Sequence, residues 1–286
     1  MDAATDLLPR IRAAVPGLRP AEARLADALL ADPAAWATRP MTELAAASDT
    51  SPTTLVRFSR RLGYDSFREL RVDLATGAAE ERMRAGAGAD TSDIDRDDTL
   101  DEIIGKIVTN ETLSISDTAA ALDRAELRRA VDAVAGARRI DLFGVGASSV
   151  VRLDLEQKLS RIGLAALGWA DAHAAWTAAA VLPRGSVAVG ISHSGKTAET
   201  LRFLRLASER GVRTIALTNF AESPLATAAD IVLLTAAREH RFRSGALGSR
   251  IAQLTVVDCL FTGVVQATYE RSADAVRRTR DAVAPG

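Results

Sequence analysis

The spacing of hydrophobic residues divides the chain into two parts with different periods. In the N-terminal part, apolar residues recur every three or four positions, a spacing that predicts amphipathic helices around one core. The predicted helices cover residues 6–15, 21–30, 42–47, 52–62 and 66–74, with breaks at Pro16-Gly17, Asp32-Pro33 and Gly63. Because the connections are short, we expect a compact all-helical domain over residues 1–76.

This pattern is lost in the next stretch and then returns. Residues 77–98 contain glycines, alanines and a polar run without apolar periodicity, as is typical of a linker. A helical pattern resumes at Thr99, and a second helix is expected over residues 124–135. In the first of these helices one apolar face is formed by Leu100, Ile103, Ile104 and Ile107.

From residue 139 onward, short apolar runs alternate with helical patterns. Strands are predicted at 140–143, 187–191, 212–217 and 231–234, and helices at 150–162, 174–181 and 197–209. This alternation predicts a doubly wound α/β domain, whose parallel sheet is flanked by helices. We place this domain at residues 99–286. Ligands of such folds bind at the carboxyl ends of the strands.

A long helix is expected near the C-terminus, from about Gly245 to Ala273. It exposes apolar residues on more than one face, as a helix in a subunit contact or a buried core helix does. Gln253, Asp258 and Gln266 interrupt its apolar run, which argues against a membrane span.

Composition narrows the classes of function. Cys259 is the single cysteine, which excludes a disulfide framework or a cysteine-based metal site and fits a reducing compartment. The formal net charge of −1 excludes an indiscriminate polycationic DNA binder, so any DNA contact requires a local basic patch. No basic-then-apolar leader opens the chain. We expect a cytoplasmic protein with no metal, cofactor or membrane partner.

One turn is unusually rich in hydroxyl groups. It runs from Ser192 to Thr197, between a predicted strand and a predicted helix. Hydroxyl donors, backbone N–H groups and a helix N-terminus converge there and favour an anion, for which phosphate is the expected ligand. The alternative is a turn that only caps its helix, because serine and threonine also cap helices for local reasons. Lys196 adds positive charge if its side chain points inward.

The segment from Met41 to Gly63 has the pattern of a helix-turn-helix. Thr42 is placed to cap a first short helix, and Ser51 caps the second, with Pro52 at its first position. In the second helix, three apolar residues have the spacing of a core face, namely Leu55, Phe58 and Leu62.

The opposite face of this second helix carries hydroxyl and basic residues, namely Thr53, Thr54, Arg57, Arg60 and Arg61. Hydroxyls near the helix start and Arg57 suit base edges in a major groove, and the remaining arginines suit phosphates. The alternative is an ordinary solvated face, since acidic residues follow at 65, 69 and 73. No acidic residue interrupts 51–63, and Arg68 and Arg71 extend the positive side, which favours DNA binding.

The same segment resembles the DNA-binding domain of the RpiR family of bacterial transcriptional regulators. The resemblance is carried by Met41-Thr42-Glu43-Leu44-Ala45, Ser51-Pro52-Thr53-Thr54-Leu55-Val56-Arg57-Phe58, Leu62-Gly63-Tyr64 and Ser66-Phe67-Arg68-Glu69-Leu70. In this family the domain is joined to a sugar isomerase (SIS) domain that senses a phosphosugar. The candidate DNA-binding residues are Ser51, Thr53, Thr54, Arg57, Arg60 and Arg61.

The second part of the chain is similar to an SIS domain. Residues 144–149, Gly-Val-Gly-Ala-Ser-Ser, resemble the first SIS motif and residues 192–197 the second, with further similarity at 158–163, 219–225, 229–230 and 243–258. The similarity implies a five-stranded parallel sheet and a phosphate bound by Ser148, Ser192, Ser194 and Thr197. The candidate ligand-binding residues are Gly146, Ser148, Ser192, His193, Ser194, Gly195, Thr197 and Glu239.

Details of this site leave alternatives open. A dinucleotide site is the other reading of the glycine pair at 144 and 146, but its fingerprint needs glycine or alanine where Ser149 stands. His193 is either a sugar-hydroxyl contact or a partly exposed turn residue. Glu239 and His240 lie in a segment that approaches the sugar in related domains.

The resemblance implies a regulator, a repressor by the commoner family behaviour, of carbohydrate-metabolism genes. Its N-terminal domains would pair on operator DNA, in a homodimer or homotetramer, and a phosphosugar effector would shift DNA binding. One alternative is a phosphosugar isomerase or lyase, with Glu239, His193 or His240 as general base. Another is a regulator whose pocket takes a different anion or no ligand. The dedicated helix-turn-helix favours a regulator over an enzyme.

Overall fold

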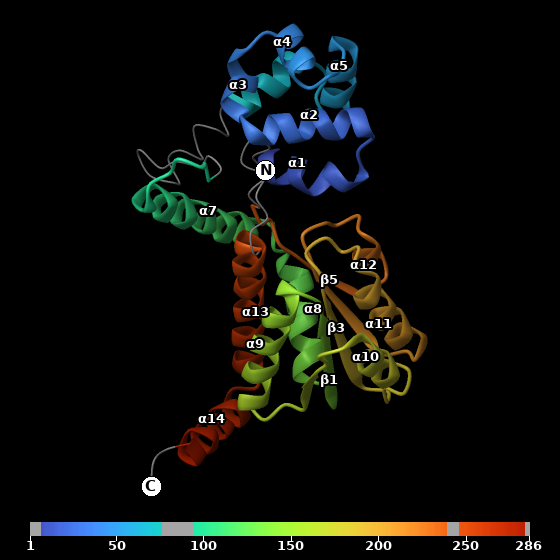
Figure 1. The fold of residues 1–286 in the computed structure, drawn as a ribbon. Coiled ribbons are helices and arrows are strands. Elements are labelled where there is room, and N and C mark those ends of the chain that lie inside the picture. Colours follow the sequence, from blue (N-terminus) through green and yellow to red (C-terminus); the bar gives the residue numbers. More distant parts are fainter. Residues whose placement is uncertain (1–6, 76–93, 239–245, 284–286) are drawn as a thin grey trace. The chain divides into compact units, whose positions relative to one another are not determined.

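The computed structural model of the protein describes residues 7–75, 94–238 and 246–283 (Figure 1). The chain divides into two compact units, Met1–Leu113 and Ser114–Gly286. The division falls inside a single helix, α7 (Leu100–Ala121). Two residues named above, Glu239 and His240, lie outside the described residues.

The N-terminal unit begins with a bundle of short helices, as predicted. Its elements are α1 (Leu7–Ala14), the 3-10 turn η2 (Val15–Gly17), α2 (Pro20–Ala31), α3 (Pro33–Thr38), α4 (Met41–Ala47) and α5 (Pro52–Arg61), and residues 67–75 are also helical. The break predicted at Asp32-Pro33 is present, because α2 ends at Ala31 and Asp32 is non-helical, but the short helix α3 that follows the break was not predicted. The Asp32 carboxylate accepts a hydrogen bond from the Ala35 N–H at 2.9 Å, and Pro33 suits the first position of a helix.

The core of this bundle holds α5 in place. Leu55, Phe58 and Leu62 face the core, as their spacing predicts. The buried Trp36 of α3 meets the rings of Phe58 and Phe67 edge-on, with centroids 6.4 and 6.3 Å apart. The helix that the sequence analysis missed therefore supplies a central side chain of the core.

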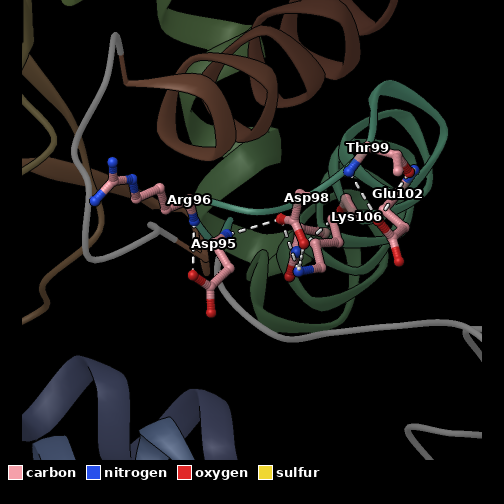
Figure 2. Close-up of polar contacts among 7 residues, drawn as sticks. Asp95, Arg96, Asp98, Thr99, Glu102 and Lys106 are labelled. Atoms are coloured by element: carbon pink, nitrogen blue, oxygen red, sulfur yellow. Dashed lines mark hydrogen bonds and ion pairs between the residues drawn. The ribbon is translucent and has the colours of Figure 1, made fainter.

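The start of α7 is fixed by polar contacts (Figure 2). The Thr99 N–H donates to Glu102 Oε2 at 2.8 Å, and the Glu102 N–H donates to Thr99 Oγ1 at 3.3 Å, which is a capping box. The Lys106 ammonium donates to both carboxylate oxygens of Asp98 at 2.8 Å, and both side chains are largely buried. Asp98 also accepts from the Asp95 N–H. Residues 94–98 are thus tied to the first turns of α7.

We expect acid to loosen the first turn of α7. Hydrogen bonds from the backbone N–H and the hydroxyl of Thr99 lower the pKa of Glu102 below its ordinary value of 4.5. A carboxyl group with a lowered pKa stabilises the fold above its unfolded pKa, and this contribution is lost as the pH falls through the folded pKa. Amide protection factors for residues 99–104 should therefore fall as the pH drops below the ordinary carboxyl value of 4.5 and through the lowered pKa of Glu102. The Glu102→Gln variant does not titrate at this position and should change less; an identical fall in both proteins would contradict the prediction.

The apolar face predicted for α7 is only partly buried, because Ile103 and Ile107 are half-buried whereas Leu100 and Ile104 are exposed. Leu100, Ile104 and Val108 are 78%, 59% and 58% exposed, whereas Lys106 and Asn110 are buried. The Asn110 amide donates to the Lys106 carbonyl at 2.9 Å. Within the described chain, the first half of α7 therefore buries two polar side chains and leaves three apolar ones in solvent.

The C-terminal unit contains a five-stranded parallel sheet with helices on both faces, which confirms the predicted fold. Its strands are β1 (Arg139–Gly144), β2 (Ala166–Gly168), β3 (Ser186–Ile191), β4 (Arg213–Thr218) and β5 (Ile231–Leu234), in the order β2-β1-β3-β4-β5. One face is covered by α8 (Arg124–Ala135), α9 (Ala147–Arg161) and α13 (Leu247–Ala267), the other by α10 (Ala172–Ala179), α11 (Ala198–Glu209) and α12 (Pro224–Thr227) (Figure 1).

Alternate residues of the central strand serve the two cores. Val187, Val189 and Ile191 of β3 join the core beneath α8, α9 and α13, while Ala188 joins the core that contains Phe203 of α11. A strand buried on both faces is continuously apolar, which is why its sequence shows no alternation.

The predicted long C-terminal helix is in fact two helices. After α13 the chain bends by 108° and continues as α14 (Tyr269–Val283). At the bend, Thr268 has a non-helical backbone (φ −125°, ψ 35°), and its hydroxyl hydrogen-bonds the Val264 carbonyl at 2.7 Å and the Ser272 hydroxyl at 2.8 Å. Within the described ranges no single helix is long and apolar enough to span a membrane; α13 and α14 meet that test only as this bent pair.

Candidate functional site

The two serine-containing turns of the C-terminal unit follow neighbouring strands. β1 and β3 pair in parallel, with Gly144 opposite Ile191 at their carboxyl ends. From there the chain runs to β2 on one side of β1 and to β4 on the other side of β3. The turns at 144–149 and 192–197 therefore flank the point where the strand order reverses, which is the ligand-binding crevice of doubly wound sheets.

Close approach at this point requires glycine. A Cβ atom on Gly144 would lie 2.9 Å from the Ile191 carbonyl oxygen and 3.0 Å from that of Ser148. Gly146, at the start of α9, has a φ of 62°, which side chains disfavour. These glycines bring the first turn of α9, with the largely buried Ser148, close to the end of β3.

The second turn gathers the hydroxyl groups of Ser192, Ser194 and Thr197. Ser192 Oγ and Thr197 Oγ1 are hydrogen-bonded at 2.9 Å, and Ser194 Oγ accepts from the Lys196 N–H at 3.2 Å. The Gly195 N–H donates to the Ser192 carbonyl at 3.1 Å. The turn is thus closed by its own contacts, while the Lys196 side chain is exposed.

The helices that begin at these turns lack side-chain caps. Gly146 precedes α9 and Thr197 precedes α11, and neither residue's side chain accepts a hydrogen bond from its helix. By contrast, α8, α10 and α12 are capped by Asp123, Asp171 and Ser223. The first N–H groups of α9 and α11 are therefore without the usual side-chain acceptor at the place where the two turns meet.

A buried asparagine supports the second turn from below. The His193 carbonyl accepts from Thr218 Oγ1 at 3.2 Å and from the Asn219 N–H at 3.0 Å. The Asn219 side chain, 4% exposed, accepts from Thr235 Oγ1 at 2.9 Å and from the Ala237 N–H at 2.7 Å. Asn219 therefore joins the turn to the segment that follows β5.

That segment is in turn bonded to the second half of α7. The Ala236 N–H donates to Thr118 Oγ1, and the Arg238 N–H donates to Ser114 Oγ, both at 3.0 Å. The Arg238 guanidinium also pairs with the buried Asp117, with nitrogen to oxygen distances of 2.9 and 2.6 Å. Hydrogen bonds thus lead from the hydroxyl-rich turn to α7.

The structure places most of the predicted ligand-binding residues at these two turns. Ser192 and Gly195 are buried, and His193, Ser194 and Thr197 are half-buried. The His193 ring lies edge-on to Phe220, with centroids 5.5 Å apart. The predicted residues at the turns are Gly146, Ser148, Ser192, His193, Ser194, Gly195 and Thr197; Glu239 lies outside the described residues.

Sequence reasoning missed Gln253 as a residue of this site. Gln253 lies on α13, is 2% exposed, and places its Oε1 3.5 Å from Ser148 Oγ. The only signal in the sequence is a glutamine between the apolar residues Ala252 and Leu254, which by itself indicates an interruption of the apolar run and not a site. Across residues 7–75, 94–238 and 246–283, no group of three or more metal-ligating side chains gathers.

The helix-turn-helix of the N-terminal unit is braced by its neighbours. In the turn, Asp49 has a φ of 48°, and Arg24 of α2 donates to the carbonyls of Ser48 and Asp49 at 3.2 and 2.9 Å. Ser51 caps α5, as predicted: its Oγ accepts from the Thr54 N–H at 3.2 Å and bonds the Thr54 hydroxyl at 2.9 Å.

The candidate DNA-binding residues differ in whether hydrogen bonds hold their side chains against other parts of the unit. Thr53, Arg57 and Arg60 are exposed at positions i, i+4 and i+7, on one face of α5. Arg61 instead donates to Glu22 Oε2 at 3.2 Å and to the Gly17 carbonyl at 2.9 Å. Arg71 likewise donates hydrogen bonds to the carbonyls of Ala37 and Thr38, at the end of α3. Position on a helix did not distinguish these bracing arginines from free ones.

Comparison with known proteins covers both units. A model of the helix-turn-helix domain of the rpiR family matches residues 5–81, and an SIS domain model matches residues 133–263. An HTH-type transcriptional regulator of Caldanaerobacter subterraneus subsp. tengcongensis is 40% identical over 273 residues, covering 96% of this chain and 94% of the relative. The HTH-type regulator YbbH of Bacillus subtilis is 32% identical and covers 93% of each chain.

Solved structures give the same picture. The Vibrio vulnificus NanR protein complexed with ManNAc-6P matches with a TM-score of 0.61 at 29% identity, over 98% of both chains. The relatives are named as transcriptional regulators, which supports the regulator over the isomerase or lyase. The chain belongs to the RpiR family of HTH-type transcriptional regulators, with an SIS domain joined to its helix-turn-helix domain.

Proposed function

We propose that this protein represses carbohydrate-metabolism genes from operator DNA and that a phosphosugar bound at the two turns controls its DNA affinity. The observation that carries the proposal is the pair of uncapped helix N-termini, α9 and α11, at the strand-order reversal of the sheet. The serine and threonine hydroxyls surround the same point.

Phosphate suits this arrangement for physical reasons. Helix N-termini carry partial positive charge and free N–H donors, and together with hydroxyls they hold a dianion without a metal. Lys196 is exposed, so the neutral donors are the ones that line the turn. The NanR relative, solved with ManNAc-6P, supports a sugar phosphate as the ligand class.

DNA recognition is assigned to the exposed face of α5. Thr53, Arg57 and Arg60 lie together on this face, and an arginine in a major groove binds guanine edges or phosphates. Ser51 and Thr54 preserve the helix start, and Arg61 braces α5 against Glu22. Helix-turn-helix proteins read paired half-sites, so we propose a homodimer or homotetramer acting in the cytoplasm.

The response to ligand is assigned to the contacts beneath the second turn. Asn219 bonds both the turn and the segment after β5, and Thr118 of α7 bonds that segment. A ligand that changes the turn therefore acts on groups that are bonded to α7. Ligand control requires that the phosphosugar bind the DNA-competent and DNA-weak arrangements with different affinity.

Two substitutions test the two halves of this proposal against each other. Arg57→Ala should weaken binding to an operator selected from random DNA by about 1–3 kcal/mol, because it removes a base or phosphate contact, and should leave phosphosugar binding intact. Ser194→Ala should keep operator affinity and weaken the response to the sugar phosphate, because it removes a donor from the turn. Fluorescence anisotropy of labelled operator, with and without a panel of sugar phosphates, measures both effects.

The control for Arg57 is Arg61→Ala on the same helix. It should lower thermal stability, because it breaks contacts with Glu22 and Gly17, whereas Arg57→Ala should not. The proposal fails if Arg57→Ala leaves operator affinity unchanged, or if no sugar phosphate alters DNA binding.

A further inference from the structure

Gln253 places a buried amide group beside the first turn of α9. The side chain lies on α13, is 2% exposed, and directs its Oε1 to within 3.5 Å of Ser148 Oγ. Its Nε2 is buried and has no hydrogen-bond partner among the residues that the structure describes. The surrounding α13 residues Ala252, Val256 and Val257 are buried and apolar.

A buried amide N–H₂ without an acceptor is unfavourable, and native proteins rarely keep one without a purpose. Here the unpartnered donor lies next to the N-terminus of α9, where Gly146 leaves the helix N–H groups without a side-chain cap. A bound oxyanion would accept hydrogen bonds both from the N–H groups at the start of α9 and from the Gln253 amide.

We propose that Gln253 is a ligand-binding residue whose Nε2 donates a hydrogen bond to a phosphate oxygen of the bound phosphosugar. This inference rests on the sensor function proposed above and adds a binding residue from α13, outside both serine-containing turns. The amide also selects for charge: its N–H₂ attracts the anion, whereas a carboxylate in its place would repel it.

This role requires the orientation of the amide in which Oε1 faces Ser148 Oγ and Nε2 is the group without a partner. If its nitrogen and oxygen were exchanged, the N–H₂ would face Ser148 Oγ and the buried oxygen would lack a donor, and that oxygen would disfavour an anion nearby. Phosphate binding therefore stabilises the orientation in which Nε2 is the free group.

The test compares Gln253→Met with Gln266→Met in the full-length protein. Both substitutions replace a glutamine on α13 with an unbranched apolar side chain, but Gln266 is exposed. Inorganic phosphate is the first probe, titrated by calorimetry, and a panel of sugar phosphates is the second. We expect Gln253→Met to weaken binding about 10- to 100-fold and Gln266→Met to leave it unchanged.

A second measurement separates a binding role from a structural one. Removing a donor that has no partner in the free protein should leave the melting temperature of ligand-free Gln253→Met equal to or above that of the wild type. A clear drop in that temperature, or phosphate affinity equal to wild type, overturns the assignment of Gln253. If the wild-type protein binds neither inorganic phosphate nor any sugar phosphate, the proposed sensor function fails and the inference fails with it. Gln253→Glu should lose phosphate binding more completely, because it places a carboxylate beside the anion.

Discussion

Gly195→Ala should abolish the response to phosphosugar while DNA binding is retained. Gly195 has a φ of 62°, and an added Cβ would lie 2.1 Å from Ser223 Oγ, 2.3 Å from Ser223 Cβ and 2.9 Å from Thr218 Oγ1. The turn cannot keep its shape against these contacts, and the left-handed backbone alone costs an alanine about 1–2 kcal/mol. We expect affinity for the effective sugar phosphate to fall at least about 100-fold, which corresponds to ~2.7 kcal/mol.

The matched control is Gly211→Ala. Gly211 follows α11 with a similar φ of 69°, but nothing lies within 4 Å of the position that its Cβ would occupy. It should therefore show the backbone cost in thermal stability without losing ligand binding. Calorimetry with the sugar phosphate and anisotropy with operator DNA give both readouts. Equal ligand affinities in the two variants would contradict a binding role for the turn.

Asp141→Ala should produce the largest loss of stability in the C-terminal unit. The fully buried Asp141 carboxylate of β1 accepts two hydrogen bonds from Arg139, at 2.7 and 2.8 Å, and one from Trp169 Nε1 at 2.7 Å. Hydrogen bonding to this carboxylate raises the pKa of Arg139. Removing it leaves a guanidinium and an indole without their acceptor, so we expect the free energy of unfolding to fall by about 3 kcal/mol.

Urea denaturation followed by circular dichroism measures this loss. The control is Asp274→Ala on α14, where Asp274 pairs with Arg277 and Arg278 but is about half exposed. A solvent-exposed ion pair of this kind contributes about 0–1 kcal/mol. Comparable losses in the two variants would show that the contacts of Asp141 do not anchor β1 to the loop after β2.

The sequence predicted the main elements because their signals are local. The apolar strands β1, β3, β4 and β5 and the helices between them follow directly from their periods. The three-residue strand β2 is too short to leave a period, and it is recognised only by its pairing with β1. The bend at Thr268 leaves no periodic signal either, because its mark is a threonine hydroxyl that bonds the Val264 carbonyl one turn earlier.

The sequence motifs predicted where the hydroxyl-rich turn and the basic helix lie, but not which residues from elsewhere in the chain contact them. The hydroxyl-rich turn follows a strand in the sequence, but its support by Asn219 comes from a later strand end. The contact of Ser148 with Gln253 also joins residues that are 105 positions apart. Likewise, Arg57 and Arg61 are equivalent on a helical wheel. They differ because Arg61 donates a hydrogen bond to Glu22, which lies 39 residues away in the sequence.

The support beneath the second turn also bears on how such sensors diversify. Thr218 and Asn219 both bind the carbonyl oxygen of residue 193, and neither of those bonds involves the imidazole. A backbone oxygen is the same whichever side chain the residue carries. Under the function proposed above, a different side chain at position 193 would alter contacts with the effector while the bonds that hold the turn stay in place. In the proposed sensor, the bonds that hold the turn and the side chain that faces the effector are thus encoded by different groups, so design can change the side chain without rebuilding the turn.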